Sequence, residues 1–223
     1  MEYIRQHTSI PVPKVFKVYK QEGVGREDVV MGYVGGQTLE EAWPKMTKAL
    51  KQAVVNELAG HVEQMRKLVP PRDGFVGSVS LGNGYDHRFG GDRFGPFNNM
   101  EDFHPHILRH DSLDAWREEK DVVQVHSRPN AHLTKFTHGD LVPSNVIVKD
   151  GKIAAIIDWE TAGWFPEYWE YTKIRYQWRP YREEFYREMD RVMVTYPAEL
   201  AAEQAIWKRY DWNAYELPTG RGE

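Results

Sequence analysis

The chain contains no cysteine, so disulfide bonds, thiolate metal sites and thiol nucleophiles are all excluded. It also lacks any run of about 18 apolar residues, the length that a membrane-spanning helix needs, and its mean hydropathy is -0.66. The opening residues, MEYIRQHTSIPVPK, have no apolar segment of the kind found in secretory signals. We therefore expect a cytoplasmic protein that has no membrane partner.

The chain also has no excess of positive charge. Lysine and arginine number 29 against 33 aspartates and glutamates, which gives a formal net charge of -4. A nucleic-acid partner is therefore not expected, because such binding depends on a basic surface. The 223 residues are 41% hydrophobic and 28% charged, as in ordinary globular proteins, and suffice for one large domain or two small ones.

Periodicity and turn signals predict an α+β layout rather than alternating strands and helices. Thr38 and Glu41 form a capping-box pattern that opens a helix. The prolines at 11 and 13 favour an extended path, and the polar residues 21–28 suggest a hairpin loop between two strands. Helices are predicted at 2–7, 47–68, 100–110, 112–126 and over most of 163–210, and strands at 15–19, 29–34, 146–148 and 153–157.

Polar side chains around the second strand pair form the most informative pattern in the chain. His138 and Asp140 precede the strand at 146–148, and Asn145 comes five residues after Asp140. Asp158 follows the strand at 153–157, and an Asp-Gly turn between the strands predicts a tight hairpin. The hairpin would bring Asn145 and Asp158 together. Oxygen ligands of this kind suit Mg²⁺, and a further carboxylate can accept a hydroxyl proton, as in phosphoryl-transfer enzymes.

These residues belong to a set of motifs that resembles the aminoglycoside phosphotransferase and choline kinase superfamily, most closely its fungal-type members. The matching segments are SIPVP at 9–13, VMGYVGG at 30–36, RFGPF at 93–97, HGDLVPSN at 138–145 and DWETAGWFPEYWE at 158–170. The resemblance implies a protein-kinase-like fold with a helical C-terminal lobe and a nucleotide between the lobes. Residues 1–36 would be a reduced nucleotide-binding lobe and residues 37–223 the helical lobe.

The resemblance also implies roles for individual residues. Asp140 would be the catalytic base, supported by His138, while Asn145 and Asp158 would bind Mg²⁺. A hinge beside the adenine of ATP would contain Met31, Tyr33, Val34 and Gly35. The expected activity is phosphoryl transfer from ATP to a hydroxyl of a small molecule.

Acidic and aromatic side chains after Asp158 are candidates for substrate binding. Three of these acids, Glu160, Glu167 and Glu170, could recognise a cationic or polyhydroxylated substrate, or could simply begin a solvated helix. The aromatic side chains could form a stacking wall, although core packing is their commoner role. The predicted substrate-binding residues are Glu160, Trp159, Trp164, Glu167, Tyr168 and Trp169.

Three parts of the resembling family have no counterpart in the sequence: a nucleotide-covering loop, a strand lysine and the glutamate that pairs with it. Because kinase catalysis depends on positioning and on charge stabilisation, we expect weak kinase activity from a chain shortened in this way. Alternatives are a repurposed enzyme of secondary metabolism that performs ATP-independent acid–base chemistry, such as cyclisation or elimination, and a non-catalytic pseudokinase. A homodimer could cover the strand edge left by the missing parts.

Overall fold

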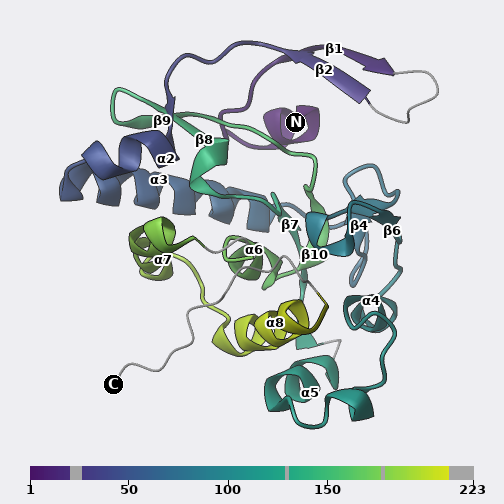
Figure 1. The fold of residues 1–223 in the computed structure, drawn as a ribbon. Coiled ribbons are helices and arrows are strands. Elements are labelled where there is room, and N and C mark those ends of the chain that lie inside the picture. The colour runs from purple at the N-terminus through teal and green to yellow at the C-terminus, as the bar shows by residue number, and fades with distance from the viewer. Residues whose placement is uncertain (21–26, 129–130, 177–178, 211–223) are drawn as a thin grey trace, which may run out of the picture. The chain divides into compact units, whose positions relative to one another are not determined.

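The computed structural model describes residues 1–20, 27–128, 131–176 and 179–210. Two compact units make up these residues (Figure 1). The first comprises Met1–Leu68 and Leu141–Trp159, and the second comprises Val69–Asp140 and the described residues from Glu160 onward. The lobe boundary that the sequence suggests at residue 36 stays a prediction.

The first unit combines one long helix with two small antiparallel sheets. Its helices are α1 (Glu2–His7), α2 (Leu39–Ala42) and α3 (Lys48–Lys67), with short 3₁₀ turns η1 (Trp43–Lys45) and η5 (Pro143–Asn145). Its strands are β1 (Val15–Lys20), β2 (Glu27–Met31), β3 (Gln37–Thr38), β8 (Val146–Lys149) and β9 (Lys152–Ile156). Strand β1 pairs with β2, while β3, β8 and β9 form a separate three-stranded sheet.

Local signals explain the helices of this unit. Thr38 and Glu41 form the predicted capping box at the start of α2. Helix α3 begins after Thr47, whose hydroxyl accepts a hydrogen bond from the Leu50 N–H. The helix buries the apolar face that its periodicity predicts, apart from Leu50, which is 41% exposed. The strand predicted at 29–34 ends earlier in the structure. Strand β2 ends at Met31, and residues 32–36 lie outside any strand.

The second unit is mainly helical. Its helices are α4 (Met100–Ile107), α5 (Lys120–His126), α6 (Trp169–Lys173), α7 (Glu183–Asp190) and α8 (Pro197–Tyr210), with 3₁₀ turns η2 (His87–Phe89), η3 (Leu113–Trp116) and η6 (Pro180–Arg182). Its strands are β4 (Gly77–Ser78), β5 (Gly84–Tyr85), β6 (Arg93–Phe94), β7 (Thr134–Thr137) and β10 (Gly163–Pro166). Helices α5 and α8 lie side by side in this unit (Figure 1).

Strand β10 is a correction to the sequence interpretation, which assigned helix after Gly163. Its four residues are all buried, and it pairs with β7 on one side and β4 on the other. A short, fully apolar run reads equally as helix or central strand. Gly163 permits the strand pairing, because a Cβ there would lie 2.4 Å from the carbonyl oxygen of Gly77.

Helix α4 ends at Ile107, three residues before the end of the helix predicted at 100–110. The helix contains Pro105 and continues through it to Ile107. Phe103 of this helix packs with Phe165 and Trp169 in the apolar core of the unit. The predicted loop at 21–28 lies outside the described residues from 21 to 26, and β2 begins at Glu27.

Candidate functional site

The β8–β9 hairpin brings Asn145 and Asp158 to the same end of two paired strands. Val146 is paired with Ile156 in the antiparallel register, and the backbone N–H of Ile157 donates a 2.9 Å hydrogen bond to the carbonyl of Asn145. Asp158 is the next residue along the chain. The hairpin therefore brings the backbone of Asn145 and that of Asp158 close together within one unit. The metal-binding role of their side chains stays a prediction.

The backbone at Asp158 is unusual, because its φ is 62° and lies in the left-handed region. Such a conformation is disfavoured for residues other than glycine, asparagine and aspartate. The next residue anchors the turn: the indole N–H of Trp159 donates a 2.8 Å hydrogen bond to the Ile156 carbonyl, and its ring is buried. Asp158 itself is exposed, so the turn leaves this residue accessible.

The donor set at the hairpin fits Mg²⁺. An amide oxygen and a carboxylate are hard ligands, and Mg²⁺ commonly takes only one or two protein ligands beside water and phosphate oxygens. Within the described part of the chain, no group of three or more histidine, aspartate or glutamate side chains could hold a metal ion. A closed zinc site, which needs about four protein ligands, is therefore not formed there.

Asp140 lies in a turn directly after β7. Its backbone N–H donates a 3.2 Å hydrogen bond to Nδ1 of His138, whose side chain is fully buried. Because Nδ1 accepts, the ring carries its proton on Nε2. Asp140 is half-buried, whereas His138 cannot reach solvent. His138 thus stabilises the turn through this hydrogen bond, and its part in catalysis stays a prediction.

A buried carboxylate on α6 fixes the same turn. Glu170 is 2% exposed and accepts hydrogen bonds from the backbone N–H groups of His138 at 2.6 Å and Gly139 at 3.3 Å. The hydroxyl of Thr161 donates to the His138 carbonyl at 2.9 Å. Gly139 has a φ of 78°, and a Cβ there would lie 2.9 Å from the Thr161 carbonyl oxygen. Three hydrogen bonds, made by Glu170 and Thr161, therefore determine the backbone that carries Asp140.

The predicted metal ligands and the predicted base fall in different compact units. Asn145 and Asp158 belong to the first, and Asp140 belongs to the second, because the chain passes between units after Asp140 and again after Trp159. Hydrogen bonds within the first unit fix the hairpin, and hydrogen bonds within the second unit fix the turn that carries Asp140. Their roles in catalysis stay predictions.

The predicted hinge follows β2 in the first unit. Gly32 donates its N–H to the Lys14 carbonyl at 2.8 Å, which ends the strand pairing. Met31 is the last strand residue, and Val34 and Gly35 are half-buried. Tyr33 is 95% exposed. Adenine binding by these residues stays a prediction, as does a homodimer through the nearby β1–β2 edge.

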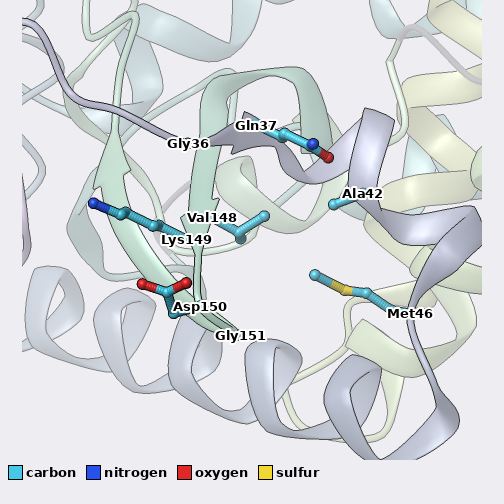
Figure 2. A pocket seen from close by; sticks show the side chains of 8 residues that line it. All are labelled: Gly36, Gln37, Ala42, Met46, Val148, Lys149, Asp150 and Gly151. Carbon is cyan, nitrogen blue, oxygen red and sulfur yellow. The ribbon is translucent and has the colours of Figure 1, made fainter.

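A hollow of about 280 Å³ lies beside the β8–β9 turn in the first unit (Figure 2). Ala42, Met46 and Val148 point toward it, whereas the side chain of Lys149 extends away. Asp150 and Gly151, which form the turn, line its rim. Asn145 precedes β8 at the opposite end of the hairpin, so this hollow is separate from the predicted metal ligands.

Glu160 lies in the second unit and contacts His87. His87 Nε2 lies 3.2 Å from Glu160 Oε1, and both side chains are partly exposed. His87 belongs to the segment between β5 and β6. No local motif marks this contact, because its partners are far apart in the chain.

The other predicted substrate-binding residues occupy less accessible positions. Trp164 is 2% exposed, and Tyr168 and Trp169 are 0% exposed, so core packing describes the rings in this structure. Trp169 stacks on Phe165 with ring centroids 5.2 Å apart. Glu167 accepts hydrogen bonds from the Leu133 N–H and the Tyr196 hydroxyl. Their contact with a substrate stays a prediction, and Trp178 of the same aromatic run lies outside the described residues.

Comparison with solved structures identifies the fold. Aminoglycoside phosphotransferase APH(2'')-Ib in its ADP-bound form has a TM-score of 0.58 and 14% identity, and the match covers 99% of this chain and 74% of that one. A complex of APH(2")-IIa with gentamicin has a TM-score of 0.55 and 15% identity over 93% and 68% of the two chains. A ternary complex of APH(4)-Ia with AMP-PNP and hygromycin B has a TM-score of 0.60 and 17% identity over 93% and 72%.

These matches define the chain as a protein with the kinase-like fold of aminoglycoside phosphotransferases, which confirms the α+β, kinase-like prediction. The model of the phosphotransferase enzyme family matches residues 1–206. The chain therefore belongs to the phosphotransferase enzyme family. No curated protein sequence gives a significant match. Among the residues that the structure describes, no helix has both the length and the apolar character needed to cross a membrane.

Proposed function

We propose that the chain transfers the γ-phosphoryl group of ATP to a hydroxyl of a small molecule in a Mg²⁺-dependent reaction. Family membership supports the reaction class. The observation that supports the assignment of residues is the Ile157–Asn145 hydrogen bond, which joins the backbone of Asn145 to that of the residue directly before Asp158. Bound Mg²⁺ would neutralise charge on the phosphate oxygens.

Asp140 acts as the base in this proposal. Its carboxylate would accept the hydroxyl proton of the acceptor as the oxygen attacks phosphorus. The buried Glu170 and His138 hold the backbone of the turn, so the carboxylate needs little reorganisation before reaction. Asn145 and Asp158 would hold the metal ion. Solved relatives of this fold bind ADP or AMP-PNP, and some bind hygromycin B or gentamicin, which supports a nucleotide donor and a small hydroxylated acceptor.

Titration calorimetry with ATP, in the presence and absence of Mg²⁺, tests the donor. We expect binding that strengthens with Mg²⁺ and that weakens at least tenfold in Asp158→Ala, because the variant lacks a metal ligand. Phosphate transfer should fall by a factor of 10² or more in Asp140→Asn, while ATP binding stays unchanged. No heat of binding at millimolar ATP would refute the proposal and favour ATP-independent chemistry or a non-catalytic role.

A further inference from the structure

Three consecutive residues in the second unit, Asp86, His87 and Arg88, have contrasting environments. Asp86 is 0% exposed and Arg88 is 5% exposed, although both are charged. His87 lies between them with its side chain 34% exposed. Burying two charges on either side of an accessible imidazole requires strong compensation, which the contacts of each neighbour supply.

The Asp86 carboxylate is tied to α6. Its Oδ1 lies 2.6 Å from Lys173 Nζ, and its Oδ2 accepts a hydrogen bond from the indole N–H of Trp169 at 3.3 Å. Oδ1 also accepts the backbone N–H of Arg88 at 3.0 Å, which closes a local turn. The backbone immediately before His87 is therefore fixed to the helical core.

Arg88 is tied to a different helix. Its guanidinium forms an ion pair with Glu203 of α8, and both side chains are almost completely buried. The same guanidinium lies over the Trp169 ring, 4.7 Å from its centroid. The Arg88 carbonyl accepts a 3.0 Å hydrogen bond from Arg109. His87 thus lies between two residues whose side chains are buried and paired, while its own side chain stays partly exposed.

The accessible imidazole meets Glu160. Nε2 lies 3.2 Å from Glu160 Oε1, and Nδ1 lies 3.5 Å from the Tyr85 hydroxyl. A neutral ring with its proton on Nε2 satisfies both contacts, because it donates to the carboxylate and accepts from the phenol. The Tyr85 and His87 rings meet edge to face with centroids 5.3 Å apart, which further restricts the imidazole.

We propose that His87 is a positioning residue that holds the Glu160 carboxylate ready for an N–H or O–H donor of the acceptor substrate. Glu160 is 53% exposed and lies two residues after Asp158, so it is accessible to such a group. A carboxylate can only accept hydrogen bonds, which selects acceptors that carry an ammonium or a second hydroxyl. Fixing a flexible glutamate in advance strengthens binding, because less rotamer entropy is lost when the acceptor arrives. This inference rests on the proposed phosphoryl transfer.

Kinetics with a defined panel test the role. Transfer from ATP is measured to hygromycin B, streptomycin, gentamicin and choline, and the best acceptor is kept. His87→Leu should raise the KM of that acceptor about tenfold, with kcat and the KM of ATP within twofold of wild type. His87→Gln should restore most of the loss, because its amide can donate to Glu160. Asp92→Leu places the same leucine at an exposed site of the same loop and should leave all constants unchanged.

Nitrogen NMR of the imidazole tests the contact without any acceptor. The wild-type His87 ring should carry its proton on Nε2, and Glu160→Ala should shift it to a mixture of tautomers. A wild-type ring protonated on Nδ1 would overturn the inference, as would a His87→Leu variant with unchanged acceptor KM or a glutamine variant that restores nothing. Absence of transfer to every panel member would refute the proposed function instead, and the NMR result would still decide the contact.

Discussion

The carboxylate of Glu170 accepts a 2.6 Å hydrogen bond from the backbone N–H of His138, which lies 32 residues earlier in the chain. It also lies 3.3 Å from the Gly139 nitrogen, so one buried side chain receives two consecutive backbone donors. A buried carboxylate is costly to desolvate, and it is retained where hydrogen bonds stabilise it. Here these bonds fix the turn on which Asp140 is placed.

Glu170→Gln should therefore weaken phosphoryl transfer without removing any group that we expect to touch the substrates. The amide keeps one acceptor oxygen but directs an NH₂ group toward one of the two backbone donors. Losing a hydrogen bond to a charged group costs about 1.5–3 kcal/mol. We expect kcat to fall roughly 10-fold to 100-fold, with the melting temperature lowered as well.

Glu118→Gln, in the turn after η3, provides the matched control, because it makes the same change of charge at a side chain that is 90% exposed. Its kcat and melting temperature should equal those of wild type. A Glu170→Gln protein with unaltered kcat and stability would show that the buried carboxylate does not position the turn.

Asp158 combines an exposed carboxylate with a φ of 62°. Asparagine tolerates the left-handed region, whereas a β-branched residue clashes with its own backbone there. Asp158→Asn should thus keep most of the unfolding free energy, and Asp158→Val should lose about 1–2 kcal/mol relative to it. Urea unfolding of both variants measures the difference. Equal stability of the two would mean that the turn does not hold the residue in this conformation.

Local sequence signals predicted those elements whose partners are close in the chain. Thr38 with Glu41, and Asp150 with Gly151, define the start of α2 and the β8–β9 turn within a few residues. Asn145 and Asp158 could be paired in advance for the same reason, because one hairpin joins them. These are cases in which short-range propensity and tertiary structure agree.

Long-range pairing was not accessible from the sequence. Strand β10 is recognisable only once β4 and β7 lie on either side of it, since four apolar residues carry no period of their own. The contact between His87 and Glu160 likewise depends on two distant loops meeting. Glu170 was noticed as an acid near the predicted site, but burial under the His138 turn changes its expected role from binding substrate to supporting backbone.

The buried ion pair between Arg88 and Glu203 predicts a non-additive response to mutation. Arg88→Met should lower the unfolding free energy by about 3–5 kcal/mol, because Glu203 would stay buried without its cation. Burial already raises the pKa of Glu203, and Arg88 opposes that rise. The double variant Arg88→Met/Glu203→Leu should recover much of the loss, since two apolar side chains can fill the same space. Urea unfolding of the single and double variants gives the coupling energy, and purely additive losses would contradict the pairing.

Buried histidines on α4 and α5 predict that acid destabilises the second unit. Burial, followed by the charge of His132, lowers the pKa of His104 to about 4. Burial lowers the pKa of His126 well below its ordinary value, with His104, Arg88 and His132 acting in the same direction. The rings of His104 and His126 meet edge to face, 4.7 Å apart. Both side chains are therefore neutral in the folded protein at pH 5.

The sign follows from proton uptake. As the pH falls below 6.5, the unfolded chain binds protons at both positions before the folded chain does, and for His104 this difference persists to about pH 4. Each such proton lowers the unfolding free energy by about 1.4 kcal/mol per pH unit, so stability is full above pH 6.5 and falls as the pH decreases.

Urea unfolding at pH 7, 6 and 5 should show this loss in wild type and a shallower loss in His104→Leu/His126→Leu. His7→Gln, at an exposed position on α1, should retain the wild-type slope. Identical slopes for wild type and the double leucine variant would show that these two histidines are not the groups that sense acid.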